Sequence, residues 1–448
     1  MQNRFEKTHI LNTDMRKRYP YVEHGEGIYL FDEQGKRYID GAGGTIVVNT
    51  GHGIEEIAQV MKDQAGKVAF SYRVDFNSRP LEDLAAKACE LTGGTMDKVF
   101  FVCGGSEATE LAVKLARKYH LDNGEPARHK IISRWHAYHG STNGALSWSG
   151  MYHRRVDYTP YLRDFNHIPP AYCYRCWFGK QPENCRLECA AALNDAIQVE
   201  GPETISAFIA EPISGTSLCA AVPRIDYFEK IREICSRYGV LLILDEVMTG
   251  FGRTGKFFGY QHFNVAPDIM AIGKGVTGGY YPIAGAMISS KLADTIADAS
   301  GNFGPGHTYA GNPLGCAVGL KNIEYMEKHH LVERCSEMGK YAFMRLEELR
   351  KHPSVGDIRG KGLQIGIEFV KDKRTRETMA PKLKFSQRLH DVAMDLGLII
   401  QASSGCNRGQ SGDMIQLGPP FVITEAQIDD MIAILDTALW QVEKEAGF

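Results

Sequence analysis

Short apolar runs recur along the chain, and segments with helical spacing of apolar residues separate them. A run of apolar residues bounded by turn residues is typical of a strand that is buried on both faces of a parallel sheet. A segment with apolar residues three or four positions apart predicts an amphipathic helix. The runs lie at residues 98–102, 130–133, 206–210, 240–244 and 269–272, and helical spacing follows at residues 108–115 and 227–238. This alternation predicts an α/β fold with a doubly wound, mainly parallel sheet.

The two ends of the chain have a different pattern. Residues 27–40 predict a β-hairpin with its turn at residues 32–35. Residues 314–349 are rich in helical spacing, and residues 355–369 read as paired strands. A helix at 389–396, a strand at 398–400 and a final helix at 425–444 complete an α+β segment.

Two of the apolar runs end in residues that carry chemistry. Asp245 ends the run at 240–244, and Lys274 follows the run at 269–272 between two glycines. The carboxyl ends of parallel strands meet at one edge of a sheet, where α/β proteins bind ligands. A lysine amine and a carboxylate in one crevice suit pyridoxal 5'-phosphate (PLP), because the lysine forms a Schiff base and the carboxylate keeps the pyridine nitrogen protonated. The pair alone leaves open a structural aspartate and a solvated lysine.

Two further strand ends carry candidate cofactor contacts. Gly105 and Ser106 lie in a glycine turn between a strand and a helix, which is a geometry that offers free N–H groups to a phosphate. The turn lacks the GxGxxG pattern of dinucleotide sites, and a plain strand–helix turn remains the alternative. Tyr138 follows the strand at 130–133, where an aromatic ring stacks on a flat ligand or packs in the core.

Composition narrows the class of protein. The 448 residues are 44% hydrophobic and 23% charged, with a net charge of -3, so nothing favours binding to nucleic acid or to an anionic membrane. The length predicts two domains. The sequence has no apolar run of about 18 residues and no signal-peptide core at its start, so we expect a cytoplasmic protein without membrane contact.

Four of the eleven cysteines, Cys173, Cys176, Cys185 and Cys189, fall in one segment. Their spacing suits a four-cysteine zinc site, and it also suits free thiols in a surface excursion. The sequence does not decide between them, and we predict no metal.

The stretch from Asp245 to Lys274 as a whole resembles the signature of class III aminotransferases, which are fold-type I PLP enzymes. It reads Asp-Glu-Val-x-x-Gly-Phe-Gly-Arg-Thr-Gly, followed by Pro-Asp-Ile-x-x-x-Gly-Lys-Gly. Matching motifs continue in order from about Gly27 to Thr424. The resemblance implies a large PLP-binding domain at 51–315 and a smaller α+β domain that both termini form, from residues 1–50 and 316–448. It also implies a homodimer, or a dimer of dimers, with active sites at the interface.

The resemblance assigns roles to individual residues. It makes Lys274 the Schiff-base lysine and Asp245 the partner of the pyridine nitrogen. It assigns the remaining cofactor contacts to Gly105 and Ser106 at the phosphate, to Tyr138, His139, Glu211, Val247 and Met248 around the ring, and to Thr308 at the phosphate of the neighbouring subunit.

The implied reaction is a ping-pong transamination between an ω-amino acid or primary amine and a keto acid. The apolar Met248 is similar to the residue that amine:pyruvate transaminases have at this position, so pyruvate is the favoured acceptor. Those relatives have an arginine where this chain has Gln401, and the nearby Arg408 lies in residues 403–410, which read as a glycine-rich loop. Arg408 is the candidate for binding the substrate carboxylate. A plain surface arginine is the alternative reading of Arg408.

Other activities use the same motifs. PLP-dependent lyases, decarboxylases and racemases of the family, including some that act on amino-phosphonates or phospho-amines, also need Lys274 and Asp245. A non-catalytic scaffold would be expected to have lost Lys274.

Overall fold

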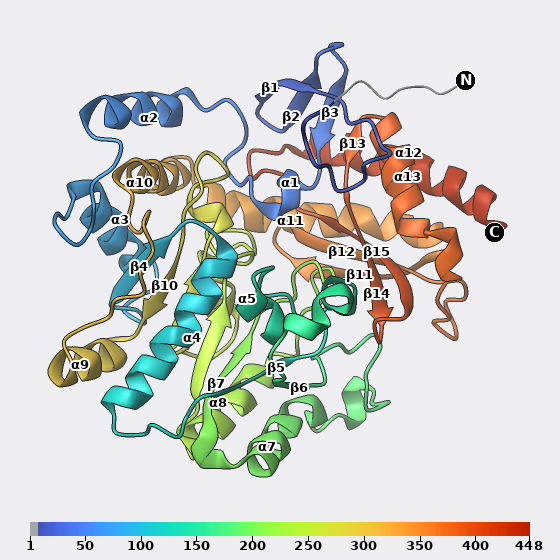
Figure 1. Cartoon of the computed structure of the whole chain (residues 1–448). Coiled ribbons are helices and arrows are strands. Elements are labelled where there is room, and N and C mark those ends of the chain that lie inside the picture. The colour runs from blue at the N-terminus through green and yellow to red at the C-terminus, as the bar shows by residue number, and fades with distance from the viewer. Residues whose placement is uncertain (1–7) are drawn as a thin grey trace.

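A seven-stranded sheet forms the centre of the computed structural model, which describes residues 8–448 (Figure 1). Its strands, in the order in which they pair, are β4 (Lys98–Val102), β10 (Ala284–Ile288), β9 (Ile269–Ile272), β8 (Leu241–Asp245), β7 (Ile205–Ala210), β5 (Lys130–Arg134) and β6 (Asn166–Ile168). The five strands from β9 to β6 pair in parallel, whereas β10 is antiparallel to β9 and to β4. The predicted mainly parallel sheet is confirmed.

Helices cover both faces of this sheet, and the alternation of side chains along β8 shows why. Ile243 packs in the cluster that contains Leu111 of α4 (Gly105–Asp122). Leu242 and Leu244 belong to the opposite cluster, with Ile231 of α8 (Tyr227–Tyr238). Successive residues of a strand point to opposite faces, so a continuous apolar run is needed where both faces are covered.

Seven more helices of the described chain lie between the N-terminal hairpin and α10, and their lengths range from four to 13 residues. They are α1 (Gly43–Ile46), α2 (Glu55–Lys67), α3 (Arg79–Glu90), α5 (Asn143–Trp148), α6 (Tyr152–Arg155), α7 (Glu188–Glu200) and α9 (Ser290–Ala299).

Two smaller sheets lie beside the central one, and one of them pairs strands near the start of the described chain with a strand from its C-terminal part. In the first sheet, β2 (Tyr29–Asp32) and β3 (Arg37–Asp40) form the predicted hairpin, β1 (Val22–Glu26) pairs with β2, and β13 (Leu398–Ile399) pairs in parallel with β3. The second sheet has the order β11 (Val355–Lys361), β12 (Gln364–Phe369), β15 (Ser411–Leu417) and β14 (Gln401–Asn407). Helices α11 (Leu331–Leu346), α12 (Phe385–Asp395) and α13 (Glu425–Ala446) pack beside these sheets, whereas α10 (Pro313–Lys328) packs against α2 and α3.

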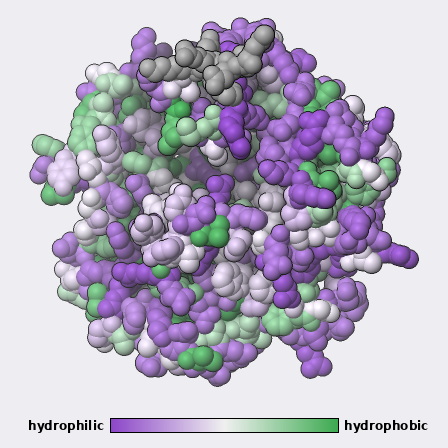
Figure 2. All heavy atoms as spheres, turned by 45° about the vertical axis from the view of Figure 1, so that its right-hand side comes forward, coloured by the Kyte–Doolittle hydropathy of each residue, from purple (hydrophilic) through white to green (hydrophobic). Residues whose placement is uncertain are grey.

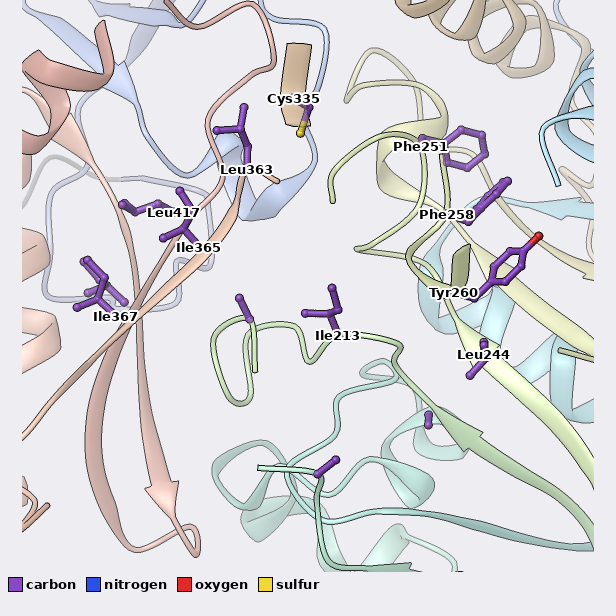
Figure 3. Packing of buried hydrophobic residues seen from close by; sticks show 14 of the residues in the cluster. Ile213, Leu244, Phe251, Phe258, Tyr260, Cys335, Leu363, Ile365, Ile367 and Leu417 are labelled. Atoms are coloured by element: carbon purple, nitrogen blue, oxygen red, sulfur yellow. The ribbon is translucent and has the colours of Figure 1, made fainter. Parts of the chain in front are cut away.

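One apolar core runs between the central sheet and the C-terminal part of the chain. Figure 3 shows Leu363, Ile365 and Leu417 on one side, and Leu244 with Phe258 on the other. Outside, the face in Figure 2 is mostly hydrophilic, with scattered hydrophobic side chains. Within residues 8–448, no helix is long and apolar enough to cross a membrane.

The prediction of a loop at residues 403–410 is wrong in part. Residues up to Asn407 belong to strand β14, which pairs with β15, and only the tip of this hairpin is a turn. The ladder is irregular between Ser404 and Asn407, and Gly405 has a φ of +89°. Such a strand has no clean alternation of apolar and polar residues, so its sequence reads as a loop.

Candidate active site

A cavity of about 290 Å³ lies at the carboxyl ends of the central strands. It is lined by Asp245 from the end of β8, by Lys274 after β9 and by the start of α4. Nine of the residues that the sequence singles out line it: Gly105, Ser106, Tyr138, His139, Glu211, Asp245, Val247, Met248 and Lys274.

Asp245 is buried, and both of its carboxylate oxygens have a partner. The Val247 N–H donates to Oδ1 at 3.0 Å, and His139 Nδ1 lies 2.7 Å from Oδ2. The His139 ring is fully buried, and its Nε2 has no hydrogen-bond partner in the described chain. His139 therefore fixes the direction of the Asp245 carboxylate.

Lys274 adopts a backbone conformation that few lysines adopt. Its φ is +44°, and Gly273 and Gly275 flank it. Its Nζ donates to the carbonyl oxygen of Thr45 at 2.8 Å, so the N-terminal segment reaches the cavity. Burial lowers the pKa of the amine to about 8, although the negative charges of Asp245 and Glu211 oppose this shift. A lysine with a lowered pKa is more often neutral and so more nucleophilic.

The start of α4 meets the cavity in a tight cradle. A Cβ at Gly105 would lie 2.9 Å from a methyl group of Val247, and a Cβ at Gly140 would lie 2.5 Å from Ser106 Oγ. Gly140 also has a φ of +139°, which disfavours other residues. The Ser141 N–H donates to Ser106 Oγ at 3.0 Å. Backbone therefore approaches the cavity closely here, at a helix N-terminus that favours an anion.

Glu211 contributes a buried acid to the same wall. Its Oε1 accepts a hydrogen bond from the Gly215 N–H at 3.0 Å, and Arg134 Nη2 lies 3.8 Å from Oε2. Burial raises the pKa of this carboxyl group.

These groups match what PLP requires of a protein. A lysine amine, a carboxylate held by a histidine, an aromatic ring and a helix N-terminus with small residues line one cavity. The buried Nε2 of His139 and Oε2 of Glu211, which have no hydrogen-bond partner in the described residues, also suit a polar ligand.

Several residues of the cavity were not predicted from the sequence as site residues. Arg154 of α6 lines it, and no ion pair joins Arg154 to a carboxylate of residues 8–448. Thr45, Thr216 and Gln401 line it as well, and Gln401 Nε2 donates to Thr45 Oγ1 at 3.1 Å and to Thr216 Oγ1 at 3.3 Å. No motif marks Arg154, because its place depends on how the segment after α5 folds back.

Two predicted residues do not line this cavity. Arg408 lines a separate cavity, where its guanidinium lies 5.0 Å from the centre of the Trp177 ring. Thr308 is exposed in the loop before α10, and its predicted contact concerns a second subunit. Both roles stay predictions. The four clustered cysteines are free thiols, and no group of three metal-binding side chains with the geometry of a metal site occurs in the described chain.

Comparison with known proteins supplies independent evidence. The family model described as aminotransferase class-III matches residues 12–439. A taurine–pyruvate aminotransferase of Bilophila wadsworthia is 36% identical over 433 residues, which are 95% of this chain and 93% of that protein. A putrescine–pyruvate aminotransferase of Pseudomonas aeruginosa is 35% identical over 94% of this chain and 90% of its own. A diaminobutyrate–2-oxoglutarate transaminase of Halomonas elongata is 34% identical, with 94% and 90% coverage.

Solved structures agree with these relatives. An (S)-enantioselective omega-transaminase from Thermomicrobium roseum superposes with a TM-score of 0.89 at 38% identity, covering 95% of this chain and 94% of that one. The omega-transaminase of Pseudomonas jessenii in complex with PMP superposes with a TM-score of 0.90 at 33% identity, with 96% and 94% coverage.

Proposed function

The chain belongs to the class-III aminotransferases, which are PLP-dependent enzymes of fold type I, and we propose that it moves an amino group from an ω-amino acid or primary amine to pyruvate. One observation carries the proposal: Lys274, Asp245 and the start of α4 line the same cavity. The names of two relatives contain pyruvate, which supports this acceptor, and the name of a third contains 2-oxoglutarate, which is the alternative acceptor.

Lys274 has two roles in this proposal. Its amine attaches the cofactor, and the lowered pKa favours the neutral form that this attachment needs. A Lys274 amine that is not attached to the cofactor would accept the proton of the substrate carbon and return it. When bound, PLP supplies an electron sink for the negative charge that the departing proton leaves.

The other residues hold the cofactor and set its charge. Asp245, directed by His139, stabilises a proton on the pyridine nitrogen. Gly105 and Ser106, at the start of α4, would hold the phosphate, and Tyr138 would hold the ring. Amine donor and keto acid then use the same cavity in turn, which is a ping-pong mechanism.

We assign the carboxylate of the keto acid to Arg154. Arg154 is the only permanently cationic side chain among the described residues that line the cavity, because the amine of Lys274 has a lowered pKa. It is exposed and has no ion-pair partner in the described chain, so it is free to bind an anion. Met248, which lines the same cavity, suits the apolar part of an amine donor.

Arg408 remains the alternative anchor. The tip of the β14–β15 hairpin packs on α6: a Cβ at Gly409 would lie 2.8 Å from Cβ of Tyr152. Arg408 and Arg154 therefore belong to neighbouring segments, and a movement of the tip would bring Arg408 towards the mouth of the cavity.

The proposal includes a homodimer in which Thr308 completes the phosphate site of the neighbouring subunit. Its exposure in the loop before α10 supports this role, because the side chain is free to contact a second copy. We also propose a large PLP-binding domain at residues 51–315 and a smaller domain formed by residues 1–50 and 316–448. The proposed location is the cytoplasm.

A donor and acceptor screen tests the function. Purified enzyme is mixed with single amines, and the cofactor absorbance reports the half-reaction; pyruvate or 2-oxoglutarate is then added to restore the starting spectrum. We expect ω-amino acids or primary amines to change the spectrum, and pyruvate to restore it faster than 2-oxoglutarate. Product formation without any keto acid would instead identify a lyase, a decarboxylase or a racemase.

A further inference from the structure

A second cavity, lined by cationic side chains, lies between the cysteine-containing excursion and the β14–β15 hairpin. Its volume is about 290 Å³. We call it the basic cavity and define it by Arg175, Trp177, Lys180, Arg376, Asn407 and Arg408. Among the described residues that line it, none carries a carboxylate.

The charges of the basic cavity are only partly neutralised. Arg175 pairs with the buried Glu368 at 2.5 Å, and Lys180 pairs with Glu188 at 3.4 Å. Arg376 and Arg408 have no ion-pair partner within residues 8–448. Arg359 shares Glu368 at 2.9 Å, so this carboxylate does not neutralise Arg175 alone. The cavity therefore keeps a positive field that an anion would neutralise.

Hydrogen-bond donors in the basic cavity are also left over. Arg175 Nη2 is buried and has no hydrogen-bond partner in the described chain. Its Nε and Nη1 donate to Glu368 and to the Arg376 carbonyl oxygen, so Nη2 alone remains. A buried donor without a partner is costly, and an acceptor in the cavity would remove that cost.

The backbone holds two of these arginines in an unusual conformation. Arg376 has a φ of +60° and Arg408 a φ of +53°, and each lies in a turn of a different segment. Glycine or asparagine suits such positions better than a long side chain. Two arginines in this conformation that line one cavity point to a function of the guanidinium groups.

The aromatic side chains indicate what kind of anion fits. Arg408 lies over the Trp177 ring at 5.0 Å, and Arg376 lies over the Tyr174 ring at 4.8 Å. The aromatic rings hold the planar guanidinium groups in place. One guanidinium group can donate two parallel hydrogen bonds to two oxygens of the same phosphate. The volume leaves room for a group larger than a bare oxyanion.

We propose that the basic cavity binds a phosphate monoester, with the phosphate between Arg175, Arg376 and Arg408 and the organic part against Trp177. The site is separate from the cavity that contains Lys274. Arg408 lies at the tip of the hairpin whose first residue, Gln401, lines the Lys274 cavity. A bound monoester would therefore restrain the segment next to the entrance of the active site.

Binding is measured on the holoenzyme by isothermal titration with phenyl phosphate and, separately, with inorganic phosphate. PLP then occupies the active-site phosphate position, so the titration reports a second site. We expect saturable one-to-one binding that is tighter for phenyl phosphate and weaker at high salt. In Arg376→Gln the dissociation constant should rise about tenfold or more, and Arg376→Lys should recover part of this loss.

Arg374→Gln is the matched control, because Arg374 is an exposed arginine of the same turn that does not line the basic cavity. Its binding should equal that of the wild type. If inorganic phosphate binds as tightly as phenyl phosphate, the site is one for a bare oxyanion and the organic part of the proposal is wrong. An absence of saturable binding, or an equal loss in the Arg374 and Arg376 variants, would overturn the proposal. Retention of the cofactor spectrum and of the thermal transition shows that each variant is folded.

Discussion

His139 Nδ1 lies 2.7 Å from Asp245 Oδ2, and both side chains are buried beside the cavity that contains Lys274. The second oxygen of Asp245 accepts from the Val247 N–H, so the carboxylate has one orientation. In the proposed mechanism this orientation decides how well Asp245 holds a proton on the cofactor. His139 is thus a positioning residue, which acts through Asp245.

Replacing Asp245 tests the electrostatic role. Asp245→Asn should still bind PLP but lose roughly two orders of magnitude in kcat, as when a preorganised electrostatic contact is removed. His139→Phe should lose less, about tenfold to a hundredfold, as expected for an orienting partner. His139→Asn keeps an N–H donor, so its kcat should lie between those of the wild type and of His139→Phe. We would measure kcat and the pH dependence of the cofactor spectrum; near wild-type turnover in Asp245→Asn would exclude the role.

Much of this cavity was predictable from the sequence, because several of its lining residues lie at the carboxyl ends of strands that the sequence predicts. Asp245 ends β8 and Lys274 comes shortly after β9, and the carboxyl ends of neighbouring parallel strands must meet. The sequence did not reveal Arg154, because α6 reaches the cavity through the packing of the irregular segment between α5 and β6. Strand β14 was missed because it lies at the edge of its sheet and contains an irregular pairing.

The second prediction identifies the lysine that attaches PLP. Borohydride reduction of the holoenzyme followed by peptide mapping should label Lys274. Lys274→Ala should have no covalent attachment and no turnover, because no other lysine lines the cavity in the described chain. A label on another lysine would refute the assignment. Lys256→Ala, which changes an outlying lysine of the same region, is the control and should be labelled normally at Lys274.

The third prediction concerns pH and the stability of the apoenzyme. The pKa of Lys274 is lowered from 10.5 to about 8 in the folded chain, so between these values the unfolded chain binds the extra proton. The free energy of unfolding should therefore rise with pH across this window. Lys274→Met removes the effect, so the variant should be more stable than the wild type near pH 7 and lose that advantage towards pH 10. Thermal unfolding of both apoenzymes would measure this, and a difference that does not change with pH would contradict it.

The fourth prediction tests whether Thr308 acts across a dimer interface. Thr308→Ala should weaken PLP binding. In a hybrid dimer of one Thr308→Ala subunit and one Lys274→Ala subunit, the single site with a lysine receives an intact Thr308 from the other chain. That site should bind PLP with wild-type affinity. A hybrid that keeps the weakened affinity would show that Thr308 does not act across the interface, and an active monomer in sedimentation would refute the shared site altogether.

The last prediction separates Arg154 from Arg408 as the group that binds the keto-acid carboxylate. Arg154 lines the cavity and lacks an ion-pair partner in the described residues, whereas Arg408 lies over Trp177 in the basic cavity. Arg154→Ala should raise the KM for pyruvate by the equivalent of about 1.5–3 kcal/mol, the value of a hydrogen bond to a charged group. The KM for an amine without a carboxylate should change little, because that substrate makes no such bond. Arg154→Lys keeps the charge but not the paired geometry, so its KM for pyruvate should lie between those of the wild type and of Arg154→Ala.

Arg155→Ala is no suitable control, because Arg155 donates to the carbonyl oxygens of Ser147 and Ser149 and supports α5. Arg163→Ala serves instead, because Arg163 lies outside the cavity. If Arg408→Ala rather than Arg154→Ala raises the KM for pyruvate alone, the hairpin tip moves to the substrate and Arg408 is the anchor. Equal effects of either variant on both substrates would show that neither arginine selects the carboxylate.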